Sequence, residues 1–125
     1  MIANLASSDP KVRKVAADKC VFVGPTKPLI EALGNTLTDS ESDVRVSAGV
    51  TLFVAGSSVG GIISQLIVAL DDSDIRVRRL AAACLSNVGA DALPALPRLL
   101  QLASDADWIL RKWVDQAIVN ITGNA

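Results

Sequence analysis

The chain has 125 residues, of which half are hydrophobic and one fifth are charged, and its formal net charge is −1. This composition excludes a disordered, collagen-like or disulfide-framework protein, and the length suits one domain with a single core. The near-neutral charge gives no electrostatic reason to expect nucleic acid as the main partner. Its two cysteines, Cys20 and Cys84, are interpreted as free buried thiols of a cytoplasmic protein.

One stretch requires a membrane test. Residues 46–70 contain no charged side chain and are long enough to span a bilayer. Glycine interrupts this stretch at Gly49, Gly56, Gly60 and Gly61, and the repeat described next divides it into two helices around a turn. We therefore expect no membrane segment. No charged segment precedes an apolar run at the start, so we also expect no signal peptide.

A Val-Arg or Leu-Arg pair recurs along the chain at intervals of 32, 33 and 33 residues. The four pairs are Val12-Arg13, Val44-Arg45, Val77-Arg78 and Leu110-Arg111. An acid stands four residues before each arginine, at Asp9, Glu41, Asp74 and Asp107. A period of this length predicts stacked supersecondary units.

Each unit begins with a segment of helical pattern. The residues three, seven and ten places after the arginine are apolar and form one helical face, with alanine in the first of these columns in three units. Glycine is expected to end the first three helices, at Gly24, Gly56 and Gly89. The fourth unit departs from this pattern with Thr122.

A second apolar stripe follows in each of the first three units. Its members are Ile30, Leu33 and Leu37, then Ile63, Leu66 and Leu70, then Leu96, Leu99 and Ala103. Pro28 and Pro94 suit the first turns of these helices, whereas Pro97 is a potential bend in the third. Each unit is therefore expected to be a pair of helices.

The alignment predicts a single domain, residues 1–125, with repeat units at approximately 9–39, 40–72, 73–105 and 106–123. Residues 1–6 align with the end of a helix of the second type and predict a partial preceding helix. The alignment leaves open whether the chain is complete or belongs to a longer array.

Four segments resemble HEAT repeats, in the short form grouped with phycobilisome-lyase HEAT-like repeats: D-P-K-V-R-K-V-A-A, S-D-V-R-V-S-A, D-I-R-V-R-R-L-A-A-A-C-L-S-N-V-G and L-P-A-L-P-R-L-L. The resemblance covers nearly the whole chain and specifies a fold rather than an activity. It implies an all-α, right-handed superhelix (a solenoid) of about three and a half helix pairs.

The resemblance also implies a structural ladder between neighbouring units, formed by Arg13, Arg45, Arg78, Arg111, Asp39, Asp72 and Asp105. The same charges would favour the helix dipoles, which is a compatible interpretation. Because the arginine and aspartate recur in successive units, we expect a structural role for them rather than a single functional site.

The residues favour a non-enzymatic function. The chain contains no histidine, which excludes Ser-His and Cys-His pairs and imidazole metal ligands. No pair of acids stands apart from the repeat as a candidate for acid–base catalysis. We expect no catalytic residue, no metal site and no cofactor.

The first helix of the second unit is apolar on its outer face as well as its inner one. The outer positions, which are polar in most other units, form an apolar set with two residues of the first unit: Val46, Val50, Phe53, Val54, Val21 and Phe22. A helix that is apolar all round should be covered. These six residues predict a surface for a partner protein or a second copy, and shielding by neighbouring repeats is the alternative.

The last helix carries a second candidate surface, at Trp108, Trp113 and Val119. Trp108 and Val119 fall outside its main apolar arc. Either the tryptophans cap the open end of the core, or this end packs on another molecule.

Three functions follow from these patterns. The first is a cytoplasmic protein-interaction scaffold, self-associating or part of a longer array, whose partner is another protein or the chain itself. The resemblance implies a second, an accessory subunit acting on phycobiliproteins in bilin attachment or removal. A third, nucleic-acid binding, would use the basic column Lys14, Arg79 and Lys112, but acids alternate with these residues.

Overall fold

The structure of the protein is a computed structural model that describes residues 2–123. In this range the chain is helical and contains no strand, which confirms the predicted all-α solenoid. The α-helices are α1 (Pro10–Lys19), α2 (Lys27–Thr36), α3 (Ser42–Val54), α4 (Ile63–Ala69), α5 (Ile75–Val88), α6 (Leu96–Leu102) and α7 (Trp108–Thr122). Four 3-10 segments complete the fold: η1 (Ile2–Ala6), η2 (Cys20–Phe22), η3 (Gly56–Ile62) and η4 (Gly89–Ala95).

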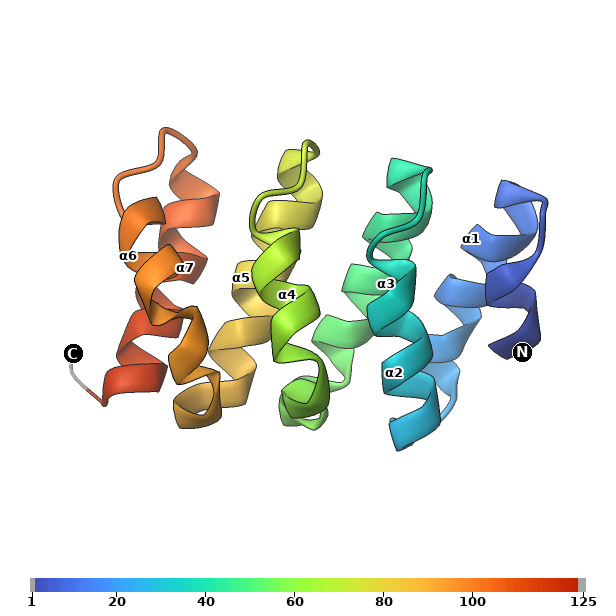
Figure 1. The fold of residues 1–125 in the computed structure, drawn as a ribbon, viewed down its shortest axis with the longest axis horizontal. Helices are drawn as coiled ribbons and strands as arrows, with labels where there is room; N and C mark the ends of the chain where they lie inside the picture. Colours follow the sequence, from blue (N-terminus) through green and yellow to red (C-terminus); the bar gives the residue numbers. More distant parts are fainter. Residues whose placement is uncertain (1, 124–125) are drawn as a thin grey trace.

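The helices form two layers (Figure 1). The first-helix layer contains α1, α3, α5 and α7, and each of these helices packs on the next. The second-helix layer contains α2, α4 and α6, with η1 beside α2 at the N-terminal end. The units therefore stack in a row from the blue end of the chain to the red end in Figure 1.

Aspartate starts three of the four first helices. The carboxylate of Asp9 accepts a hydrogen bond from the amide of Lys11, that of Asp74 from the amide of Arg76, and that of Asp107 from the amide of Leu110. These bonds satisfy amides that have no partner within the helix. The three aspartates that precede an arginine in the repeat thus have a local structural role, whereas the side chain of Glu41 makes no capping bond at the start of α3.

The helix ends differ in part from the glycine pattern. Gly89 follows α5 with a φ of 74°, and Gly123 follows α7 with a φ of 73°, positive values that glycine adopts without steric cost. Thr122, which stands in the glycine column, is the last residue of α7, and Gly123 follows it one position later in the repeat. The α-helix α1 already ends at Lys19, because the chain tightens into η2 before it reaches Gly24.

The second helices begin with 3-10 segments in the second and third pairs, where η3 precedes α4 and η4 precedes α6. Pro94 lies inside η4, and Pro97 lies in the first turn of α6, where its missing N–H breaks no helical bond. Pro97 therefore starts the α-helix rather than bending it. The uncharged residues 46–70 form part of α3, then η3 and α4. Among residues 2–123, no helix has the length and hydropathy to cross a membrane.

The core lies between the two layers. Leucines from both layers are fully buried there: Leu33, Leu52, Leu66, Leu85 and Leu99. Both cysteines are free and buried, and burial raises the pKa of Cys84 to about 12.

Candidate interaction groove

An apolar groove of about 330 Å³ crosses the first-helix layer over α5. We define the groove by its eight lining residues: Val46, Phe53, Arg76, Arg79, Leu80, Ala83, Ile109 and Trp113. All eight come from α3, α5 and α7, so the groove spans three consecutive first helices. Six of the eight side chains are hydrophobic.

Small residues on α5 and α3 determine the shape of the groove. Ala83 presents only a methyl group on α5, and the rings of Phe53 and Trp113 meet edge to face with their centroids 5.5 Å apart. Leu80 lies against Gly49 of α3, where an added Cβ would come within 2.9 Å of a Leu80 methyl carbon. The aromatic pair therefore joins α3 to α7, two units away.

Two arginines form the charged part of the groove, and both are paired. Arg76 lies within 2.7 Å of Asp74 and 3.1 Å of Asp43, and Arg79 lies within 2.6 Å of Asp107. Hydrogen bonds from Arg79, and from the amide of Leu110, hold the pKa of Asp107 at about 2. The groove is thus apolar with a rim of ion pairs, rather than a basic patch.

Two rungs of the expected ladder are present as two-pronged ion pairs. Arg13 donates to Asp39 at 2.7 and 3.1 Å, and Arg45 donates to Asp72 at 2.9 and 3.0 Å. Burial alone would raise the pKa of Asp39, but hydrogen bonds from Arg13 and the Glu41 amide hold that pKa below its usual range. Each pair joins a first helix to the loop that leads to the next unit.

The other two arginines of the ladder bond differently. Arg78 donates to the backbone carbonyl of Asp72 at 2.7 Å, and Arg111 donates to that of Asp105 at 2.5 Å. No ion pair joins Arg78 to Asp105 in the described chain, because Arg79 pairs with Asp107 at this junction instead. All four ladder arginines nevertheless reach the carbonyl six residues earlier, Ser7 for Arg13 and Asp39 for Arg45.

The structure divides the six residues of the predicted apolar surface. Val46 and Phe53 are half-buried in the groove, whereas Val50 remains exposed on α3. Val21 and Val54 line a separate cavity of about 110 Å³ between the first two units. The sixth residue, Phe22, is 88% exposed. The chain itself therefore shields part of the apolar face of α3, through Trp113.

The three residues of the predicted C-terminal surface also separate. Trp113 is half-buried and packs back toward Phe53, whereas Trp108 is 65% exposed. Val119 is half-buried and lies outside the groove. Trp113 thus lies over α5 and against Phe53 rather than over the open end of the core, and the partner surface at Trp108 and Val119 remains a prediction.

Sequence reasoning missed Leu80, Ala83 and Ile109. Leu80 occupies the same repeat column as Trp113, so the alignment could have placed it on the same face. The alignment held no such signal for Ala83, because its importance lies in its small size. In the basic column, Lys14 pairs with Asp18 and Arg79 with Asp107. Among residues 2–123 there is no cluster of histidine, cysteine or acidic side chains that could hold a metal ion.

The comparisons with known proteins agree with this architecture. A sequence model of HEAT repeats matches residues 30–119. The chain belongs to the HEAT-repeat family. A comparison with curated proteins gives no significant match.

Several solved structures are similar in fold to the chain. An engineered protein is similar over 99% of this chain and 62% of its own, with 22% identity and a TM-score of 0.84. A designed armadillo repeat protein, YIII(Dq)4CqI, is similar over 96% and 62%, with 25% identity and a TM-score of 0.80. The complex of CpcE and CpcF of phycocyanin lyase from Nostoc sp. PCC7120 is similar over 98% and 52%, with 26% identity and a TM-score of 0.74. The HEAT-repeat chain thus spans less than two thirds of each of these proteins.

Proposed function

We propose that this HEAT-repeat chain is a non-enzymatic scaffold that binds another protein through the groove over α5. The observation that carries the proposal is the groove itself: a concave, mostly apolar surface shared by three helices. Exposed concave apolar surfaces of this kind are typical of binding sites. None of the eight lining residues is a carboxylate, thiol or hydroxyl, so the groove offers no nucleophile or general base.

The occupant that fits best is an amphipathic helix of the partner. Val46 and Ile109 face the groove from α3 and α7, with Leu80 between them on α5, and would contact the apolar stripe of such a helix. The ion pairs of Arg76 and Arg79 would lie beside its polar flank. We also propose a cytoplasmic location, which the two free buried thiols support because they suit a reducing compartment.

Affinity capture with matched variants tests the proposal. Ile109→Asp puts a charge into the groove, and Val68→Asp puts the same charge on an exposed position of α4 in the other layer. We expect a captured partner to bind the Ile109 variant at least about tenfold more weakly, and the Val68 variant as well as wild type. Equal binding to all three proteins would exclude the groove as the site.

Tryptophan fluorescence gives a second readout. The chain has two tryptophans, so a Trp108→Phe background leaves Trp113 as the sole indole, in the groove wall. Titration with the captured partner should shift the emission of Trp113 as the helix excludes water from the ring. Binding without any shift would place the partner elsewhere.

A second candidate function rests on the 26% identity to a phycocyanin lyase complex. It is an accessory role in bilin attachment to, or removal from, a phycobiliprotein. Bilin and an apo-phycobiliprotein, mixed with and without this chain and followed by absorbance, test it directly. A chain-dependent change in the bilin spectrum would favour this function over a simple scaffold.

A further inference from the structure

Each first helix has one face toward the preceding first helix and another toward the following one. Thr51 of α3 donates to the carbonyl of Ala17 in α1 at 2.8 Å. One unit further on, Cys84 of α5 lies 3.9 Å from the carbonyl of Gly49 in α3. The repeat intervals make these equivalent contacts, so a single geometric rule describes successive junctions.

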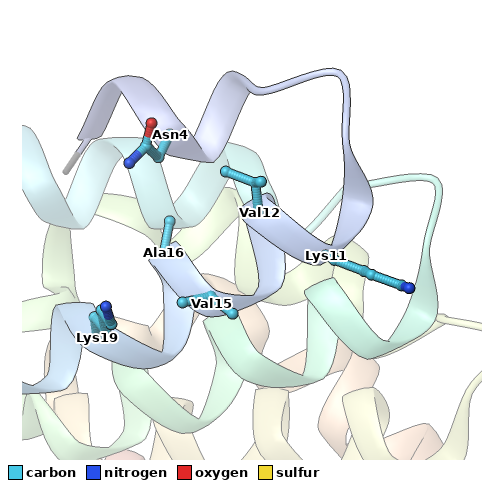
Figure 2. A pocket seen from close by; sticks show the side chains of 6 residues that line it. All are labelled: Asn4, Lys11, Val12, Val15, Ala16 and Lys19. Atoms are coloured by element: carbon cyan, nitrogen blue, oxygen red, sulfur yellow. The ribbon is translucent and has the colours of Figure 1, made fainter.

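The face of α1 that has no first helix before it in the described chain is exposed. We call it the α1 end face, and it contains Val12, Val15, Lys19 and Phe22. Val12 is 38% exposed, whereas its equivalents Val44, Val77 and Leu110 are at most 1% exposed. A depression of about 500 Å³ runs along this face, beside Asn4 of η1. Figure 2 shows Val12, Val15 and Ala16 along α1, with Lys11 and Lys19 at the two ends of the row.

The opposite end of the first-helix layer presents the forward face of α7. We call it the α7 end face, and it contains Trp108, Lys112, Asp115 and Val119. Their equivalents in α5 are Ile75, Arg79, Ala82 and Ser86. That α5 face is covered by α7, where Arg79 pairs with Asp107 and the carbonyl of Ser86 accepts from Asn120 at 2.8 Å. On α7, by contrast, Trp108, Lys112 and Asp115 are exposed.

Continuing the junction rule by one unit brings the two end faces of different copies together. Lys19 is equivalent to Thr51 and Cys84, and Asp115 is equivalent to their neighbours Ala17 and Gly49. Lys19 of one copy would therefore lie against Asp115 of another. These two repeat columns hold small, uncharged residues at the α1–α3 and α3–α5 junctions. At the two end faces they hold residues of opposite charge.

Two further pairs follow from the same rule. Arg79 pairs with Asp107 across the α5–α7 junction, and the equivalent pair across the end faces is Lys112 with Asp9 of the next copy. Asn120 donates to the carbonyl of Ser86. Phe22 of the next copy is equivalent to Asn120, and Val119 is equivalent to Ser86, so these two residues would be neighbours across the end faces. Two opposite-charge pairs and one apolar pair thus fall in register.

We propose that copies of this chain stack head to tail, the α1 end face of one on the α7 end face of the next. The second copy is the occupant because three contacts of the interior junctions carry over to the end faces as two opposite-charge pairs and one apolar pair. Such a contact is heterologous, so each copy that joins a stack presents a free end face to a further copy, and the assemblies grow with concentration. None of the residues that define the two end faces lines the groove over α5, so this inference goes beyond the proposed function.

Charge reversal tests the stacking in solution with the full chain. Sedimentation velocity should show an average mass for wild type that rises with concentration and falls with added salt. Lys19→Asp and Asp115→Lys should each weaken association at least about tenfold, because each places like charges in register. An equimolar mixture of the two variants should regain assembly, since the two introduced side chains then face each other with opposite charges and the wild-type pair forms at the alternate junction.

The mixture also shows that both variants are folded, because restored association requires two intact end faces. Ser64→Asp and Ser64→Lys, on the exposed side of α4, control for net charge and should assemble as wild type does. A wild type that is monomeric at every concentration, single variants that assemble normally, or a mixture that stays monomeric would overturn the proposal. Val46 lines the groove on α3, away from both end faces, so loss of partner binding by Val46→Asp without loss of stacking would separate the two sites.

Discussion

The interior junctions of the first-helix layer and its two end faces use the same repeat columns but fill them with different residues. Inside, Thr51 and Cys84 approach the carbonyls of Ala17 and Gly49, and none of these residues is charged. At the ends, the same columns hold Lys19 and Asp115. The interior junction is fixed by chain connectivity and needs close packing, whereas an end face must also select its partner.

The largest difference between the two regions should appear in core packing. Leu85→Ala removes a fully buried side chain of α5 and should lower the free energy of unfolding by about 2–5 kcal/mol. Val15→Ala on the α1 end face, where the side chain is 49% exposed, should cost below about 1 kcal/mol in dilute solution. Urea unfolding measures both, and equal losses would show that the end face is as tightly packed as the interior.

Ion pairs should show the same contrast with a smaller effect. The Arg45–Asp72 pair has side chains only 13% and 11% exposed, so Arg45→Gln should cost about 2–3 kcal/mol. The side chains of the Arg98–Asp71 pair are 35% and 56% exposed, so Arg98→Gln should change stability by about 1 kcal/mol or less. Chemical denaturation of the two variants provides the comparison. A larger loss of unfolding free energy in Arg98→Gln than in Arg45→Gln would contradict the structural role of the ladder.

The close approach of α3 and α5 can be tested at one glycine. In Gly49→Ala the new Cβ would lie 2.9 Å from a methyl carbon of Leu80, so we expect a loss of about 1–2 kcal/mol from overpacking. Gly24→Ala is the control, since no atom beyond the adjacent residues lies within 4 Å of its added Cβ. Thermal unfolding should therefore lower the Tm of the first variant and not that of the second.

The smallest effect concerns pH. Asp107 has its pKa lowered from 3.8 to about 2 in the folded chain, chiefly by Arg79. A lowered folded pKa stabilises the fold above pH 3.8, and this contribution is lost as the pH falls through 3.8 toward 2. Asp107→Asn keeps the helix cap but cannot titrate. The stability gap between wild type and this variant should shrink between pH 5 and pH 2, and a constant gap would contradict the assignment.

Periodicity was sufficient to predict the helix pairs, because burial on one face repeats every three or four residues and the whole unit repeats in turn. It located the first-layer columns and the start of each first helix at an acid. It did not predict η3 and η4, since apolar spacing does not distinguish a 3-10 turn from the first turn of an α-helix.

The groove could be predicted only in part. Val46, Phe53 and Trp113 were identified from the sequence, but as members of two separate surfaces. Their meeting depends on Ala83, a residue from a third helix whose small size matters only once the helices are stacked. The resemblance to HEAT repeats also implied Arg78 as the ladder arginine of the third unit, whereas Arg79 makes the ion pair, with Asp107. This difference depends on side-chain direction, which the repeat pattern does not encode.

Cysteine cross-linking tests the head-to-tail register most directly. Phe22→Cys and Val119→Cys leave Lys19 and Asp115 in place, and the native Cys20 and Cys84 are buried. Because a disulfide requires close approach, oxidation of the double variant should give a ladder of covalent multimers on a non-reducing gel. On the same gel, each single variant should run as a monomer, because the register places no second introduced cysteine opposite the first. Double variants that form no ladder, or single variants that cross-link equally well, would contradict the complementarity of the two end faces.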